Sequence, residues 1–221
     1  MFALRTIRIE GDVARNSVST IRANAAPRLA GSFFTLDLAR ARAAFESVPW
    51  VRHAVVRRVW PNALAVRLEE HRAEARWAGA DGNDRLVNNF AEVFEANIGD
   101  VEDEGLPRLS GPEGSAPQML ALLRRLKPLL IKIDAGDIDE LALSKRGSWR
   151  ATLEGGAVIE LGRGTDDEVM ARAASFVRTL PRVVEHYQRP LQTADLRQAG
   201  GYAVHLAGVT TTAPLAPARK K

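Results

Sequence analysis

The stretch of sequence that decides the fold is residues 49–71, which read PWVRHAVVRRVWPNALAVRLEEH. At residues 64–68 apolar residues alternate with others, which is typical of a strand with one buried face. The preceding Pro61-Asn62 pair favours a turn, because proline presets φ and asparagine tolerates tight geometry. Residues 51–60 are rich in valine, which favours extended structure. The stretch is therefore predicted to be a β-hairpin.

A second interpretation starts from the aromatic and basic residues of the same stretch. Single-stranded nucleic acid stacks on exposed aromatic side chains beside a basic groove. A hairpin instead places Trp50 and Trp60 at strand ends, where they can pack against a small core. It also distributes its arginines over both faces of the strands. We therefore predict that both indoles are buried and that nucleic acid is not a partner. The arginines concerned are Arg52, Arg57, Arg58 and Arg67.

The charge of the chain supports this choice. The 221 residues carry a formal net charge of +4, but three basic residues, 219–221, close the chain. Without them 28 basic residues face 27 acidic ones, which is too small an excess for an electrostatic footprint spread over a domain. Cysteine is absent, so the sequence holds neither disulfides nor cysteine metal ligands. No run of about 18 apolar residues occurs that would span a bilayer.

The residues before the hairpin predict one strand and two helices. Residues 7–9 alternate apolar and charged side chains, which favours a first strand. Asn16 or Ser17 offers an N-cap for a short helix, and Asp37 caps a second, amphipathic helix that Pro49 ends. The predicted order over roughly the first seventy residues is therefore β-α-α-β-β.

The residues after the hairpin predict a mixed α/β region. Ser115 and Thr165 are each followed three residues later by Gln or Glu, as in a capping box that opens a helix, and Pro128 should end or kink the first of these helices. The other expected elements are a short hairpin around Asn88-Asn89, a loop at 99–117, strands at 138–143, 149–154, 157–161, 193–197 and 202–206, and a disordered tail after residue 209.

No motif in the sequence predicts catalysis or a cofactor. The four histidines, His53, His71, His186 and His205, are scattered and lack the spacing of paired metal ligands. A Gly-x-Ser-x-Gly nucleophile turn is absent. The glycine-rich turn at 162–165 precedes a helix, but three acidic residues in the first helical turn would repel a phosphate. We therefore predict a non-enzymatic protein without catalytic residues, metal or cofactor.

Motifs spread in order along nearly the whole chain resemble the FtsQ/DivIB family of cell-division proteins, in its proteobacterial form. The resemblance lies in Gly31 to Asp37, Pro49-Trp50-Val51, Val55 to Arg58, Trp60-Pro61, Leu64 to His71, Ala75-Arg76-Trp77, Leu109 to Ser115, Ser148-Trp149, Leu161 to Gly164 and Asp195-Leu196-Arg197. It implies an α+β fold: an N-terminal POTRA domain (β-α-α-β-β) at 1–72, a mixed α/β domain with a mainly antiparallel sheet at 73–209, and the tail at 210–221.

The resemblance also implies a function and a location. Members of the family are bitopic inner-membrane proteins of the division septum, with one transmembrane helix before this region, which lies in the periplasm. They are non-enzymatic scaffolds that bind FtsB and FtsL and help recruit and regulate septal peptidoglycan synthesis. The POTRA domain is expected to contact other divisome proteins.

The resemblance implies Arg146 and Arg197 as partner-binding residues, and the physics of a sheet edge adds others near the end of the chain. Residues 202–206 form the last predicted strand, and a strand at a sheet edge can accept a strand from a partner. Gln198 stands where relatives often have tyrosine, and Leu206 where some have tryptophan, so Tyr202 is predicted to supply the aromatic anchor. The predicted site residues are Arg146, Arg197, Gln198, Gly200, Gly201, Tyr202 and Val204.

An alternative is a POTRA module of an outer-membrane protein assembly or secretion system. Such proteins carry POTRA units in series. This sequence predicts one unit followed by a dissimilar domain, which favours the FtsQ/DivIB resemblance.

Overall fold

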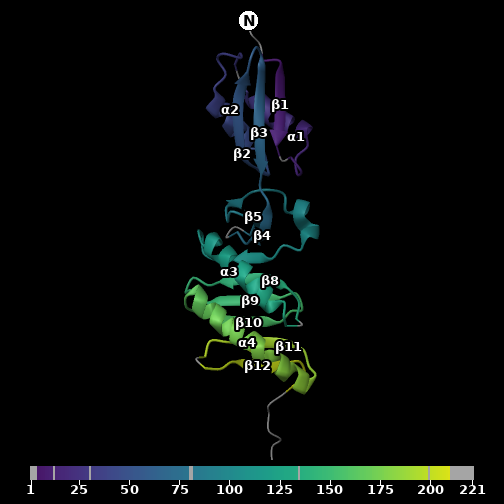
Figure 1. Cartoon of the computed structure of the whole chain (residues 1–221), viewed down its shortest axis with the longest axis vertical. Helices are drawn as coiled ribbons and strands as arrows, with labels where there is room; N and C mark the ends of the chain where they lie inside the picture. Colours follow the sequence, from purple (N-terminus) through teal and green to yellow (C-terminus); the bar gives the residue numbers. More distant parts are fainter. Residues whose placement is uncertain are drawn as a thin grey trace, which may run out of the picture. The chain divides into compact units, whose positions relative to one another are not determined.

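The computed structural model describes residues 4–209 except 12, 30, 80, 81, 134 and 199 (Figure 1). The predicted disordered tail at 210–221 lies outside the described residues. The chain divides into two compact units, unit 1 at Met1–Leu106 and unit 2 at Pro107–Lys221. The predicted α+β class is confirmed, since both units combine helices with mainly antiparallel strands. No helix in the described part is long and apolar enough to cross a bilayer.

The first part of unit 1 has the predicted order β-α-α-β-β. Its elements are β1 (Thr6–Gly11), α1 (Val18–Ala25), the 3-10 helix η1 (Ala26–Arg28), α2 (Leu38–Glu46), β2 (Val51–Val59) and β3 (Ala63–Glu70). The sheet order is β1-β3-β2, with β1 parallel and β2 antiparallel to the central β3. Figure 1 shows both helices against one face of this sheet.

The helix caps of this part form as predicted, and the helices bury one side each. The Ser17 hydroxyl accepts from the Thr20 amide, and the Asp37 carboxylate accepts from the amides of Ala39 and Arg40, which satisfies donors that a helix start otherwise leaves unpaired. The core between helices and sheet consists of Ile21, Ala25, Leu36, Ala41, Phe45, Val48, Val51, Ala54, Leu64, Val66 and Leu68.

The predicted hairpin at residues 49–71 is confirmed as β2 and β3. The prediction that both of its tryptophans are buried is right for Trp50 and wrong for Trp60. Trp50 is 3% exposed, whereas Trp60 is 79% exposed. Trp60 directly follows the last residue of β2 and lies in the turn of the hairpin, outside both strands. An alternation pattern tells which face of a strand is buried, but it says nothing of a residue in the turn.

The second part of unit 1 contains three antiparallel strands and a core cluster of its own. Its elements are β4 (Ala73–Trp77), β5 (Arg85–Asn88), β6 (Val93–Phe94) and the 3-10 helix η2 (Ile98–Glu104). Trp50 packs here with Leu86 and Val101, so its burial comes from residues 73–106 and not from the amphipathic helix. The hairpin around Asn88-Asn89 is confirmed, whereas η2 lies in a stretch predicted to be loop.

Unit 2 is a mixed sheet with two helices on one face (Figure 1). Its elements are β7 (Arg108–Ser110), α3 (Ala116–Leu130), β8 (Ile138–Leu143), β9 (Trp149–Leu153), β10 (Val158–Gly162), α4 (Asp166–Tyr187), β11 (Leu191–Asp195) and β12 (Ala203–Leu206). The strand order is β12-β11-β10-β9-β8-β7, with parallel pairs β10·β11 and β7·β8 and the other pairs antiparallel.

The two predicted capping boxes have different outcomes. At Thr165 both bonds of the box to Glu168 are present. At Ser115 the hydroxyl donates to the Pro112 carbonyl oxygen, 2.6 Å away, and caps no helix amide, so this prediction is wrong. The local turn at 112–115 offers the hydroxyl a nearer acceptor. Pro128 does not end α3 at once, because the helix continues to Leu130.

Candidate functional site

The edge strand β12 is the element that carries the predicted partner site. Among the described residues it is the last strand of its sheet and pairs with β11 alone. The antiparallel register sets Val204 opposite Ala194, with Asp195 opposite Ala203 and Thr193 opposite His205. One side of the β12 backbone therefore has no strand partner within the described part of the chain, and such an edge can pair with another chain.

The fold brings the other predicted residues to one end of this sheet. The β11–β12 connection, which holds Arg197 and Tyr202, follows the end of β11. Because β11 is parallel and β9 antiparallel to β10, the β8–β9 turn with Arg146 lies at the same sheet end. Only β10 separates β9 from β11, and strands lie roughly 4.8 Å apart. A bound segment of a few residues can therefore reach both arginines.

Arg197 is exposed but already paired with Asp195. Its guanidinium donates to both carboxylate oxygens, at 2.9 Å and 2.5 Å, and its amide donates to the same carboxylate at 3.0 Å. The side-chain hydrogen bonds and then the amide bond lower the pKa of Asp195 to about 2, and the same contact raises the pKa of Arg197. A planar guanidinium held in this way presents its remaining N–H donors in a fixed direction.

Tyr202 packs against its own chain. Its ring meets Phe176 edge-on with 5.1 Å between centroids, and its hydroxyl lies 2.6 Å from the Thr179 hydroxyl. Gln198, Gly200 and Gly201 are exposed. Together with α4 these residues line a hollow of about 450 Å³ beside β12, large enough for a partner side chain. Tyr202 therefore forms a wall of that hollow, and its role as an anchor stays a prediction.

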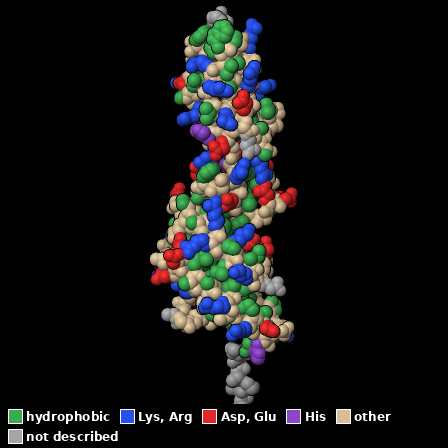
Figure 2. Space-filling view, viewed as in Figure 1, with side chains coloured by type: hydrophobic (Ala, Val, Ile, Leu, Met, Phe, Trp, Pro, Cys, Tyr) green, Lys and Arg blue, Asp and Glu red, His purple; other side chains and the backbone are tan. Residues whose placement is uncertain are grey.

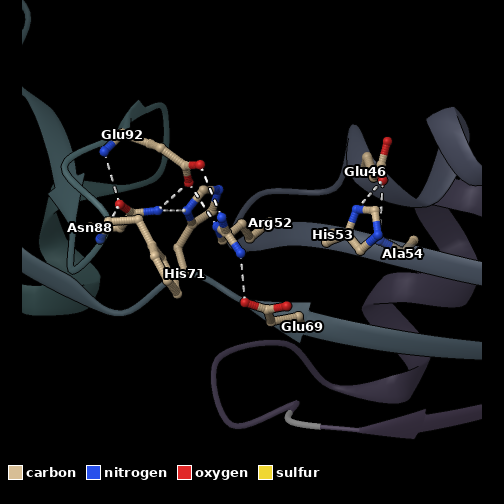
Figure 3. Close-up of polar contacts among 9 residues, drawn as sticks. Glu46, Arg52, His53, Ala54, Glu69, His71, Asn88 and Glu92 are labelled. Atoms are coloured by element: carbon tan, nitrogen blue, oxygen red, sulfur yellow. Dashed lines mark hydrogen bonds and ion pairs between the residues drawn. The ribbon is translucent and has the colours of Figure 1, made fainter.

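A second polar cluster, which the sequence reasoning missed, lies in unit 1 (Figure 3). Arg52 on β2 donates to both carboxylate oxygens of Glu92, at 2.7 Å and 3.0 Å, and to Glu69 on β3 at 2.7 Å. Its guanidinium also lies 3.9 Å from the centroid of the Phe90 ring. Glu69 could have been found from the β2–β3 register, whereas Glu92 is 40 residues away in sequence and meets Arg52 only through the fold.

Buried Asn88 organises this cluster. Its amide oxygen accepts from the amides of Phe90 and Glu92, both at 2.9 Å, so its nitrogen must be the atom that faces Glu92 and His71 Nδ1, at 2.7 Å and 2.8 Å. Nδ1 then accepts, which requires a neutral His71 with its proton on Nε2. Burial lowers the pKa of His71 in agreement with that assignment. Hydrogen bonds from Arg52 and then Asn88 lower the pKa of Glu92 to about 2.

The contacts of Glu92 should make the free energy of unfolding depend on pH, and Glu92→Gln should remove this dependence. Glu92→Gln should lower the free energy of unfolding near neutral pH by about 1 kcal/mol or less, since the pair is partly exposed and screened by water. The folded-state pKa of Glu92, about 2, is below its ordinary 4.5. The carboxylate therefore stabilises the fold above pH 4.5, and this contribution is lost as the pH falls toward 2. Urea denaturation at several pH values measures the difference.

Glu102→Gln on η2 is the matched control, because Glu102 is exposed and in the same unit. The control should differ little from wild type at any pH. A Glu92→Gln difference that persists undiminished near pH 2 would contradict the assignment of the stabilisation to its ionised carboxylate.

The described residues contain no group of three or more potential metal ligands. His53 bonds with Glu46, 3.1 Å away, and His71 stacks on Phe94 with 3.9 Å between ring centroids. The histidines that the sequence analysis found scattered thus remain scattered in the fold.

Comparison with known proteins gives the family. A model described as POTRA domain, FtsQ-type, matches residues 2–71, and one described as Cell division protein FtsQ/DivIB, C-terminal, matches residues 75–197. Three similar proteins are each named Cell division protein FtsQ. They come from Burkholderia pseudomallei (44% identical, covering 94% of this chain and 81% of that protein), Thiomonas arsenitoxydans (40%, 93% and 76%) and Bordetella pertussis (38%, 93% and 80%).

The matches confirm the resemblance drawn from the motifs. Both family models are found in the predicted order, and together they cover most of the chain. The alternative of an outer-membrane assembly or secretion module is not favoured, because the matched POTRA type and the second domain are those of cell-division proteins. This chain belongs to the FtsQ/DivIB family of cell-division proteins.

Proposed function

We propose that this chain is a non-enzymatic scaffold of the divisome that binds FtsB and FtsL and helps recruit and regulate septal peptidoglycan synthesis. The observation that carries the proposal is the edge position of β12, which among the described residues ends the sheet of unit 2. Family membership supports a role in cell division, and the edge supports a protein partner. A scaffold needs a surface on which another chain can bind, and we propose that β12 supplies it.

Strand addition to β12 accounts for both affinity and register. In an antiparallel strand, alternate residues point their N–H and C=O groups to opposite sides. About half of the four β12 residues therefore offer backbone groups outward, and each hydrogen bond formed there contributes roughly 0.5–1.5 kcal/mol. Arg197 and Arg146 then favour acidic side chains on the partner, with Gln198, Gly200 and Gly201 as further contacts along the β11–β12 connection.

We also propose the cellular location and the domain boundaries that the family implies. The chain is placed in the periplasm, as part of a single-pass inner-membrane protein at the septum whose transmembrane helix precedes residue 1. We propose domains at 1–72 and 73–209, which assigns residues 73–106, part of compact unit 1, to the second domain. The matched region spans 81% of the first relative, so the relatives contain residues beyond it. Protease protection in intact and osmotically opened cells tests the compartment, since only a periplasmic region becomes accessible when the outer membrane is opened.

The absence of enzymatic activity, metal and cofactor is part of the same proposal. The scattered histidines and the absence of a nucleophile motif support it. Metal analysis after chelator washing tests it, and a stoichiometric metal in the purified protein would contradict it.

Arg197→Ala should weaken binding of the FtsB periplasmic segment roughly thirtyfold, the effect of losing an interface hot spot. The melting temperature should change little, because the pair with Asp195 is exposed. Arg125→Ala is the matched control: Arg125 forms a similar exposed pair, 2.6 Å from Asp167, on α3. Titration calorimetry compares the three proteins. Equal affinity of wild type and Arg197→Ala would remove Arg197 from the site.

A further inference from the structure

The tip of the β2–β3 hairpin is an exposed apolar surface that the proposed function leaves unexplained. Trp60 in the turn is 79% exposed, and Phe34 in the 31–37 loop is 61% exposed. All four tryptophans lie in the described residues, and the other three are at most 6% exposed. An isolated exposed apolar residue is ordinary, but two large aromatic side chains this exposed at one end of a fold indicate an interaction surface.

Backbone and side-chain contacts hold the segments of this end together. The Arg58 guanidinium donates to the carbonyl oxygens of Phe33 at 2.8 Å and Leu36 at 2.6 Å, which ties the 31–37 loop to β2. The Arg5 amide donates to the Asn62 carbonyl oxygen at 2.9 Å, so the start of β1 lies beside the turn. We call this end, formed by residues 4–9, 31–36 and 56–62, the hairpin tip surface.

The hairpin tip surface is basic as well as aromatic. Its three segments contain Arg5, Arg8, Arg57 and Arg58 and no aspartate or glutamate. The next acidic residue along the loop, Asp37, is occupied by two helix amides. Figure 2 shows hydrophobic side chains gathered at this end of unit 1, with basic side chains close by. The three segments together therefore carry a net positive charge.

We propose that the hairpin tip surface contacts the headgroup region of an anionic phospholipid bilayer. Tryptophan is enriched where membrane and water meet, because its ring is apolar and its N–H is polar. Arginine buries its aliphatic stem while its charge stays at the lipid phosphates. Arg5, Arg8 and Arg57 have no acidic partner among the described residues, and their charge complements the negative potential of anionic lipids.

β1 begins at the same end of unit 1 as the hairpin tip surface, and this orients that surface toward any anchor that precedes β1. The strand begins beside the turn of the hairpin, since Thr6 pairs with Ala63 directly after that turn. This step rests on the proposed function, in which a transmembrane helix precedes residue 1. An anchor there would hold the hairpin tip surface at the bilayer, and the contact would fix how unit 1 stands on the membrane.

Vesicle binding by the chain as it stands tests the proposal without the anchor. With vesicles of equal phosphatidylglycerol and phosphatidylcholine at low salt, Trp60 emission should shift to shorter wavelength and acrylamide quenching should fall. Phosphatidylcholine vesicles should produce neither change, and added salt should reverse both. Trp60→Ser should abolish the spectral changes. Binding with unchanged Trp60 quenching would place the contact elsewhere, for example in basic residues 219–221, and would overturn the proposal.

Matched charge variants sharpen the result. Arg5→Ala with Arg57→Ala should weaken binding to anionic vesicles about fivefold per charge, roughly 25-fold in all. Lys132→Ala with Arg182→Ala removes the same charge from exposed positions of unit 2 and should change binding less than about twofold. Equal losses in the two pairs, or no binding by wild type, would overturn the proposal.

Two further outcomes would assign the surface to another partner. Tighter binding of single-stranded DNA than of anionic vesicles, with the same Trp60 quenching change, would show a nucleic-acid surface. The same change on adding the FtsB segment without vesicles would show a protein surface. Both would overturn the lipid assignment. Partner affinity at β12 is measured separately with Val204 variants, so failure of one proposal is distinguishable from failure of the other.

Discussion

Val204→Pro is expected to abolish binding of the FtsB segment, a loss of at least about a hundredfold. Proline has no N–H and fixes φ, so it removes a donor from β12 and prevents a regular ladder at the centre of the strand. Val204 is in the middle of the four-residue strand and opposite Ala194. An added strand must pair across this position. Titration calorimetry with the periplasmic segment of FtsB measures the effect.

Two companion variants separate loss of the edge from loss of the fold. Val204→Thr keeps the N–H and the β-branched shape and should bind within about threefold of wild type. His205→Pro removes the donor of the neighbouring residue, which points to the opposite side of the strand. Val204→Pro should therefore mainly reduce binding, whereas His205→Pro should mainly reduce the melting temperature. Wild-type affinity for both would exclude this edge as the binding site.

Trp50→Ala should have the largest effect on stability, about 3–5 kcal/mol, as expected for a buried large aromatic residue. Its ring is 3% exposed, its Nε1–H donates to Asp100 at 2.9 Å, and Phe94 meets it edge-on at 5.4 Å. The guanidinium of Arg15 lies 5.0 Å from its centroid. Alanine would leave a cavity and remove one donor from the Asp100 carboxylate, which also accepts from Asn97 at 3.0 Å. Chemical denaturation measures the free energy of unfolding.

Trp60→Ala is the matched control for this prediction. It removes the same side chain from the opposite end of the same strand, where the ring is 79% exposed. Surface substitutions of this kind usually change stability by less than about 0.5 kcal/mol. If the two variants were equally destabilised, the assignment of Trp50 to the core and of Trp60 to the surface would be wrong.

Particular residues show why some predictions from the sequence were right. Asp37 and Thr165 cap helices because capping is a local matter between a side chain and amides two or three residues away. Ser115 has the same spacing pattern, but its hydroxyl donates to the nearby Pro112 carbonyl oxygen and caps no helix amide. The pattern alone therefore identified the helix start correctly while misjudging which atom the hydroxyl bonds. Residues 98–104 form η2 although their Gly, Asp and Glu content predicted a loop.

The sequence by itself determined the order β-α-α-β-β of the first part of unit 1, the two helices and most strands of unit 2, the hairpin at 49–71, the caps of three helices and the family. These depend on contacts between near neighbours or on motifs that survive in order along the chain. The sequence missed η2 and β7, which lie in the stretch predicted to be loop. Only the tertiary structure decided which core receives Trp50, that Trp60 is exposed, and that Arg52 meets Glu92. It also set the sheet order that leaves β12 at the edge and brings Arg146 to the same sheet end as Arg197. The reason is physical: these arrangements join residues 40 or more positions apart or depend on which strands pair, and side-chain periodicity along one segment holds no information about either.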